Sequence, residues 1–182
     1  MKFFRKLVGE RLYLSPFNPE DFTDKWVEWM NDRNIAEGFG GLSNHVSPAS
    51  ARKTLEELEG HRFAIVLLDG DVLIGQISLH NIDHLHRHGF FGIMIGETEH
   101  HNKGYGAEAI RLVIDYGFRQ LNLNNIMLSV RADNYGGIAC YKKVGFKEAG
   151  RRREWYFSDG KYVDVIYMDM LAREFEIERM MR

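Results

Sequence analysis

The hydrophobic pattern of the chain changes character between residues 90 and 121, where a strand-like run is followed by a helix-like one. The run from Phe90 to Ile95 is apolar and too short for an ordinary helix, so it predicts a buried strand. After a polar, glycine-bearing loop, apolar residues recur at helical spacing from Ala107 to Leu121. A loop of this kind directs backbone N–H groups and the positive end of the helix dipole at one point. We therefore expect a phosphate group to bind where the helix begins.

The remainder of the chain alternates between short strands and helices. Asn18-Pro19 is a typical helix start, Asp69-Gly70 is a hairpin turn between two apolar runs, and Gly145 closes a helix. Further strands are expected at 11–14, 62–68, 72–79, 126–130, 146–157 and 161–171, and further helices at 22–30, 48–59 and 134–144. This order predicts an α/β protein of the α+β type, a single domain over residues 1–182. Its mixed sheet of about seven strands has helices on both faces.

Charge and composition exclude several classes of protein. The formal net charge of −2 provides no basic field, so we expect no nucleic-acid partner. The single cysteine, Cys140, excludes an intramolecular disulfide. No apolar run approaches the roughly 18 residues of a membrane span, and the basic N-terminus lacks the apolar core of a signal peptide. These features predict a cytoplasmic protein with no membrane partner.

Two motifs carry a resemblance to a known family. His101-Asn102-Lys103-Gly104-Tyr105-Gly106 is similar, in its glycines, to the Arg/Gln-x-x-Gly-x-Gly/Ala loop of the GNAT superfamily of acetyl-CoA-dependent N-acetyltransferases; His101 departs from that pattern. The segment from Asn134 to Phe146 resembles the same family's Asn-x-x-(Ser/Ala)-x-x-x-Tyr-x-x-x-Gly-Phe motif. The closing stretches 153–156 and 159–164 resemble the branch of ribosomal-protein alanine and spermidine acetyltransferases. This resemblance implies the GNAT-like fold, with a mostly antiparallel, twisted sheet.

The same resemblance implies a set of site residues. Strand backbone would pair with the pantetheine arm of acetyl-CoA, the glycine loop would hold its pyrophosphate, and a tyrosine would protonate the departing thiolate. The implied cofactor-binding residues are Ile93, Met94, Ile95, His101, Asn102, Lys103, Gly104, Tyr105, Gly106, Ala107, Asn134 and Tyr141. Tyr141 is the implied general acid, because a phenol with a pKa of about 10 keeps its proton at neutral pH.

The general base is harder to assign. Where N-terminal acetyltransferases of the superfamily often carry Glu before Val-Arg, this chain has Ser129. Glu97, just beyond the cofactor strand, is the candidate base, although a solvated loop carboxylate is the more common role for such a residue. Deprotonating an alkyl amine at pH 7 costs about 4.6 kcal/mol and a peptide α-amine about 1.4 kcal/mol. A lysine or polyamine acceptor therefore needs a stronger general base in the site than a peptide α-amine does.

Two other features were weighed as functional sites. His84, His86 and His88 alternate, but no Cys or carboxylate was recognised at ligand spacing, so we expect a solvated connector over 81–89 and no metal. The tail after Ala172 carries apolar residues on one side, including Phe175, and we formulate the hypothesis that it assists formation of a homodimer.

The function implied by the resemblance is direct transfer of acetyl from acetyl-CoA to a primary amine in a ternary complex. The acceptor alternatives are a protein N-terminus, a polyamine or another small amine. A polyamine would require clustered carboxylates, drawn from Glu28, Asp32 and Glu37. An amino-sugar nucleotide would instead favour basic and aromatic residues. A non-catalytic acyl-CoA-binding module is the alternative from outside the enzymes.

Overall fold

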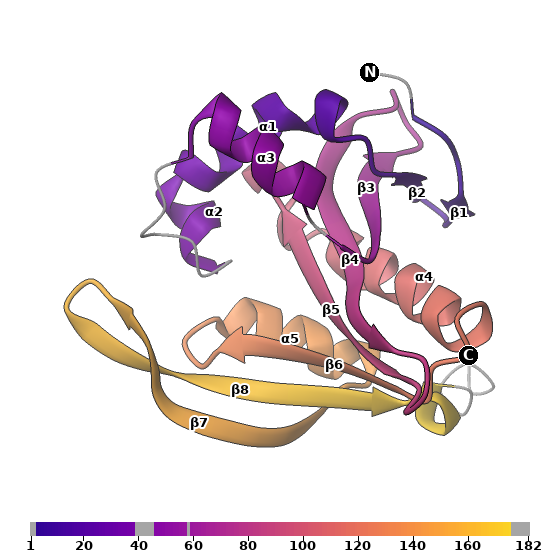
Figure 1. Ribbon diagram of the computed structural model, residues 1–182, viewed down its shortest axis with the longest axis vertical. Coiled ribbons are helices and arrows are strands. Elements are labelled where there is room, and N and C mark those ends of the chain that lie inside the picture. Colours follow the sequence, from indigo (N-terminus) through magenta and orange to yellow (C-terminus); the bar gives the residue numbers. More distant parts are fainter. Residues whose placement is uncertain (1–2, 39–45, 58, 176–182) are drawn as a thin grey trace.

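The protein folds around one eight-stranded sheet in the order β1-β2-β3-β4-β5-β6-β8-β7 (Figure 1). The computed structural model describes residues 3–38, 46–57 and 59–175. The strands are β1 (Leu7–Val8), β2 (Leu12–Pro16), β3 (His61–Leu67), β4 (Leu73–Asp83), β5 (His88–Ile95), β6 (Asn125–Arg131), β7 (Lys147–Ser158) and β8 (Lys161–Leu171). Only β5 and β6 pair in parallel, which confirms the mixed, mostly antiparallel sheet. The strand missing from the prediction is β1, whose two residues are too few to form a pattern.

Helices cover both faces of the sheet, as the sequence predicted. They are α1 (Pro19–Asn31), α2 (Arg33–Gly38), α3 (Pro48–Glu57), α4 (Tyr105–Arg119) and α5 (Tyr135–Val144), with a 3-10 turn η1 (Thr98–His100) before α4. Within the described residues, no helix is long and apolar enough to cross a membrane.

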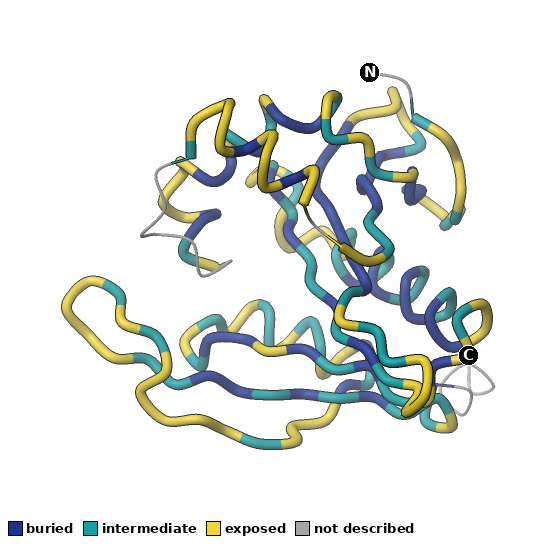
Figure 2. The backbone as a smooth tube through the Cα atoms, in the orientation of Figure 1, coloured by how far each residue is buried: buried dark blue, intermediate teal, exposed yellow. Residues whose placement is uncertain are grey.

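Alternation along β2 shows how the two faces are built. Leu12 and Leu14 are buried in the core cluster that includes Ile110 and Ile114 of α4. Tyr13, between them, is buried in the second cluster with Trp26 and the other apolar residues of α1 and α3. Successive strand side chains point to opposite faces, so one strand serves both cores. Figure 2 shows the resulting buried band along the central strands.

Helix α2 was not predicted. The sequence indicated that the first helix ends over 31–34 and is followed by a loop over 37–44. Instead, the Asp32 carboxylate accepts hydrogen bonds from Asn34 N at 2.8 Å and Ile35 N at 3.2 Å, which restarts the helix. Its Ile35 side chain is buried with α1. Residues 39–45 of the predicted loop lie outside the described residues.

The predicted solvated connector over 81–89 is present but shorter than expected. β4 continues to Asp83 and β5 begins at His88, which leaves a turn of residues 84–87. A register irregularity between His80 and Asp83 accommodates Asn81 at φ 49°, a left-handed conformation that Asn tolerates well. This end of the hairpin is largely exposed, so its residues are polar and show no hydrophobic pattern from which a strand could be predicted.

Strands β5 and β6 pair over three residues only and then separate. The paired positions are His88 with Asn125, Gly89 with Ile126 and Phe90 with Met127. Beyond Phe90, β5 pairs with β4 on one side, whereas β6 continues alongside β8. Among the described residues, one edge of β5 therefore has no strand partner over 91–95, and the strands diverge as Figure 1 shows.

Candidate active site

A cavity of about 550 Å³ lies where β5 and β6 diverge. Its walls come from the end of β5, the loop that precedes α4, the helix α5 and, at one end, residues of α2. All of the predicted cofactor-binding residues line this cavity except Lys103, which lines an adjoining one with Arg11, Arg111 and Lys143. The volume is in the range of small-molecule and cofactor sites. The structure thus brings residues from two distant motifs to one place.

The glycine loop ends at the N-terminus of α4, as predicted. Gly104 is the N-cap residue with φ 84°, and no side chain caps the helix. The left-handed conformation explains the need for glycine there, and the uncapped first turn leaves backbone N–H groups available to an anion. The open edge of β5 nearby suits an extended ligand chain. These features fit the elongated, phosphate-bearing shape of coenzyme A.

Arg11, in the turn between β1 and β2, holds this loop from outside the cavity. Its Nη1 donates to the carbonyl of Lys103 at 2.8 Å, and its Nε to Glu108 Oε2 at 2.9 Å. The guanidinium also lies 4.7 Å from the centre of the Tyr105 ring. Sequence reasoning missed Arg11, because its partners lie more than ninety residues away. The contact places a permanent cation beside the turn that is predicted to bind the pyrophosphate.

His101 occupies the position where the loop departs from the family pattern. Its Nε2 donates to the carbonyl of Ile95 at 2.8 Å, so the imidazole ties the loop to the end of β5. The exposed His101 side chain therefore helps to position the loop by bonding the backbone of β5. This role does not require His101 to contact a phosphate.

Tyr141 lies in the cavity wall with its ring against two phenylalanines. The ring centres are 5.7 Å from that of Phe91 and 6.4 Å from that of Phe146. Burial among these apolar groups raises the pKa of the phenol well above its usual value. Tyr141 is therefore protonated throughout the physiological range, as a proton donor must be.

Asn134 and Cys140 also face the cavity. Asn134 Oδ1 accepts from Gly137 N at 2.9 Å, which makes this side chain the N-cap of α5. Burial raises the pKa of the Cys140 thiol, so it stays neutral. Gly106 of α4 lies beside Cys140 of α5 in the cavity wall, since a Cβ added to Gly106 would be 3.9 Å from Cys140 Sγ.

Glu97, the candidate base, lies against α1 and is not among the residues that line the cavity. Its carboxylate receives a hydrogen bond from Trp29 Nε1 at 3.2 Å and from Lys25 Nζ at 2.9 Å. The hydrogen bond to Glu97 raises the pKa of Lys25, so the ammonium stays charged. Both contacts hold the carboxylate against α1, outside the cavity lining. The structure therefore favours a positioning role for Glu97.

The aromatic residues of α1 belong to the core. Trp26 and Trp29 are 6% and 3% exposed. A Cβ added to Gly96 would lie 2.0 Å from the Trp29 ring, so this ring covers the end of β5 directly. Glu97 and Trp29 together fix the helix on the cofactor strand.

The α2 end of the cavity is held by ion pairs. Arg131, with only 7% of its side chain exposed, bonds Asp133 at 2.8 Å and Glu37 of α2 at 3.3 Å. A second pair joins Arg33 of α2 to Asp159 in the β7–β8 turn. Both contacts tie α2 to the other half of the sheet.

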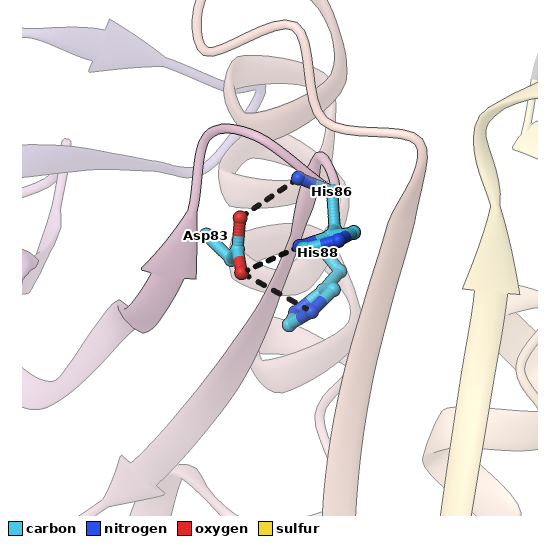
Figure 3. A group of neighbouring side chains, drawn as sticks. All are labelled: Asp83, His86 and His88. Carbon is cyan, nitrogen blue, oxygen red and sulfur yellow. Dashed lines mark hydrogen bonds and ion pairs between the residues drawn. The ribbon is translucent and has the colours of Figure 1, made fainter.

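The histidines behave differently from the prediction. Asp83, His86 and His88 lie together at the β4–β5 turn, each offering a ligand atom within 4.8 Å of the others, whereas His84 is not in the group (Figure 3). The expectation that no carboxylate accompanies the histidines is therefore wrong. The sequence pattern did not indicate Asp83 as a ligand, because it did not predict the turn of residues 84–87 that brings Asp83 close to His86.

Comparison with known proteins identifies the family. A family model described as an acetyltransferase (GNAT) domain matches residues 11–147. The "Putative ribosomal N-acetyltransferase YdaF" of Bacillus subtilis is 34% identical over 182 residues, covering 94% of this chain and 97% of its own. A spermidine N(1)-acetyltransferase of Escherichia coli K12 is 31% identical over 146 residues, covering 78% of this chain and 72% of its own.

A solved structure agrees with these matches. The spermidine N-acetyltransferase of Vibrio cholerae, crystallised with CoA and spermine, superposes with a TM-score of 0.83 at 27% identity, over 92% of this chain and 99% of that one. The chain therefore belongs to the GNAT acetyltransferase family and is an N-acetyltransferase, the family whose acetyl donor is acetyl-CoA. The resemblance inferred from the two motifs is confirmed.

Proposed function

We propose that this N-acetyltransferase acts on the α-amine of a protein or peptide, by direct transfer from acetyl-CoA in a ternary complex. The observation that carries this acceptor is the state of the carboxylates that a polyamine would need. Glu28 pairs with Lys25, Asp32 caps α2, and Glu37 pairs with Arg131. Each is already engaged within the protein, so the described residues near α2 offer little negative charge to a polycation.

The same acceptor suits a site without a strong base. An α-amine costs about 1.4 kcal/mol to deprotonate at pH 7, against about 4.6 kcal/mol for an alkyl amine. Glu97 is held by Lys25, and Ser129 is exposed on β6 where a base is common in N-terminal acetyltransferases. A water molecule is sufficient to remove a proton from an amine of low pKa.

For the donor we propose that the open edge of β5, residues Ile93 to Ile95, pairs with the pantetheine arm. The N-terminal turn of α4, from Asn102 to Ala107, would bind the pyrophosphate, with Arg11 fixing its position. Acetyl-CoA supplies the thioester whose C–S bond breaks as the C–N bond to the amine forms. Tyr141 would donate its phenolic proton to the leaving sulfur and recover a proton from solvent.

The relatives favour two acceptors. The Bacillus subtilis relative named for ribosomal acetylation aligns over nearly the whole of both chains, which supports the α-amine. The Vibrio cholerae neighbour that holds spermine supports a polyamine as the second candidate. Because the engaged carboxylates weigh against a polycation, the α-amine is the function we propose.

An amine panel tests the proposal by following release of free thiol from acetyl-CoA. The panel contains Ala- and Ser-initiated peptides, the same peptides with a blocked N-terminus and one lysine, spermidine, and an amino-sugar nucleotide. We expect kcat/KM for the free α-amine to exceed that for spermidine by at least about tenfold. The reverse order would establish the polyamine. Binding of acetyl-CoA without turnover on any amine would instead support a non-catalytic module.

A further inference from the structure

The turn between β4 and β5 gathers three side chains that metal ions commonly bind. Asp83 ends β4, His88 begins β5, and His86 lies in the turn between them (Figure 3). The turn is at the opposite end of β5 from the cavity, whose β5 lining is residues 93–95. Two imidazoles and one carboxylate form a donor set suited to late first-row divalent metals. Neither the proposed reaction nor the CoA site makes use of them.

The distances suit a shared ion. Asp83 Oδ2 lies 3.0 Å from His86 Nδ1 and 3.9 Å from His88 Nε2. Tetrahedral zinc with bonds of about 2.0–2.2 Å to N and O ligands places two ligand atoms about 3.3–3.6 Å apart. The two measured separations lie on either side of this range, so metal binding would replace the hydrogen bond between His86 Nδ1 and Asp83 Oδ2 and draw His88 closer. All three ligand atoms already lie within 4.8 Å of one another.

The imidazole of His88 makes no hydrogen bond within the described part of the chain. Its Nδ1 is buried without a partner, and its Nε2 lies 3.9 Å from Asp83, too far for a hydrogen bond. The ring stacks on that of His86, with the ring centres 6.3 Å apart, and makes only a long ion-pair contact with Asp83. A metal ion between Nε2 and Oδ2 would bridge the gap that a hydrogen bond cannot.

The turn that carries the ligands is held in place. His86 N donates to Asp83 Oδ1 at 2.7 Å, so the carboxylate is already oriented by the backbone. Arg87, with φ 58°, forks onto Asn122 at 2.7 and 2.8 Å, and its carbonyl accepts from Asn124 N at 2.6 Å. These contacts fix the turn on the segment that leads into β6. Ligands on a fixed backbone lose less entropy when a metal binds.

We propose that Asp83, His86 and His88 form a binding site for a divalent transition-metal ion such as zinc. The three protein ligands leave a coordination position for water, and the site lies on the protein surface. It stands at the end of the sheet where β5 and β6 pair, since His88 is the first residue of that pairing. Bound metal would clamp the β4–β5 turn and stabilise the junction of the two halves of the sheet. Acetyl transfer does not depend on it.

Metal titration of untagged protein, first freed of metal with a chelator, tests the site. Co²⁺ is the spectroscopic probe, through visible absorption of its bound form, and Zn²⁺ is then added to displace it. We expect one ion per chain in the wild type. Asp83→Asn, which keeps the oxygen that accepts from His86 N, and His86→Ala should each weaken binding at least about tenfold, since each removes one of three ligands.

His84→Ala is the matched control, because His84 belongs to the same turn, is exposed and is outside the group. It should bind Co²⁺ as the wild type does. Equal loss in His84→Ala and His86→Ala, or wild-type binding no tighter than that of an Asp83→Asn/His86→Ala double variant, would overturn the proposal.

Thermal unfolding supplies a second measurement that does not involve activity. Zinc at about 100 times its dissociation constant should raise the unfolding midpoint of the wild type by about 7 °C. The midpoint of His86→Ala, whose side chain is mostly exposed and whose fold should be retained, should rise by no more than about half as much, because zinc is then at most about ten times its dissociation constant. An equal rise in both proteins would contradict the site.

Discussion

At the scale of single residues, the sequence identified Tyr141 but not its surroundings. Its position in the second motif can be read directly from the amino-acid sequence. The aromatic neighbours that raise its pKa do not, because Phe91 is on β5, fifty positions earlier, and meets Tyr141 only when β5 and α5 pack together. A motif therefore identifies a candidate acid, whereas the surroundings created by folding set the pKa of its phenol.

Replacing Tyr141 by Phe tests the proton-donor role directly. The ring contacts with Phe91 and Phe146 are kept, so we expect a normal fold and unchanged affinity for CoA. Loss of general-acid assistance should lower kcat about 100-fold, measured by thiol release with a saturating amine. Tyr116→Phe is the matched control, because that phenol bonds His61 and does not line the cavity. Full turnover by Tyr141→Phe would show that the acid lies elsewhere.

At the scale of elements, the strand, glycine loop and helix around residues 90–121 were predicted in the right order. The sequence predicts β5 from a short continuous apolar run and α4 from a periodic apolar face. Neither pattern indicates Arg11, whose contacts with Lys103 and Glu108 join the turn between β1 and β2 to the loop. Helix α2 was missed for a related reason, since six residues are too few to show a period.

Arg11→Gln should loosen the pyrophosphate loop and remove a cation from its side. We expect KM for acetyl-CoA to rise about tenfold with kcat nearly unchanged, because binding common to ground and transition states is lost. Steady-state kinetics at a saturating amine concentration measure both constants. Arg5→Gln is the control: Arg5 is exposed, pairs with Asp71 and should leave both constants as they are. A fall in kcat without a change in KM would contradict the positioning role.

At the scale of the whole molecule, the class of fold was predicted correctly from the sequence, and the donor half of the site stays a prediction from the two motifs. Local signals suffice for the fold class, because hairpin turns such as Asp69-Gly70 are short. What joins the halves of the sheet was not predictable. Strands β1–β5 meet β6, β8 and β7 through three residues of parallel pairing, and α2 adds ion pairs across the cavity. Such contacts depend on the final packing.

The ion pairs of Arg131 are the part of this junction that substitution can isolate. Arg131→Met keeps most of the side-chain volume but removes the charge shared by Asp133 and Glu37. Because both carboxylates are more than a third exposed, solvent screening limits the loss of unfolding free energy to about 1 kcal/mol at pH 7. Arg33→Met, which removes the exposed pair with Asp159, should cost less.

The pH dependence of the Arg131→Met variant separates the charge from packing. The hydrogen bond from Arg131 lowers the pKa of Asp133 in the folded protein. A carboxyl with a lowered folded pKa stabilises the protein above its unfolded pKa of about 3.9, and this stability is lost as pH falls through the folded value. Urea denaturation should therefore show the difference between wild type and Arg131→Met shrinking between pH 6 and pH 3. A difference that stays constant over this range would mean that Arg131 acts through its packed side chain rather than its charge.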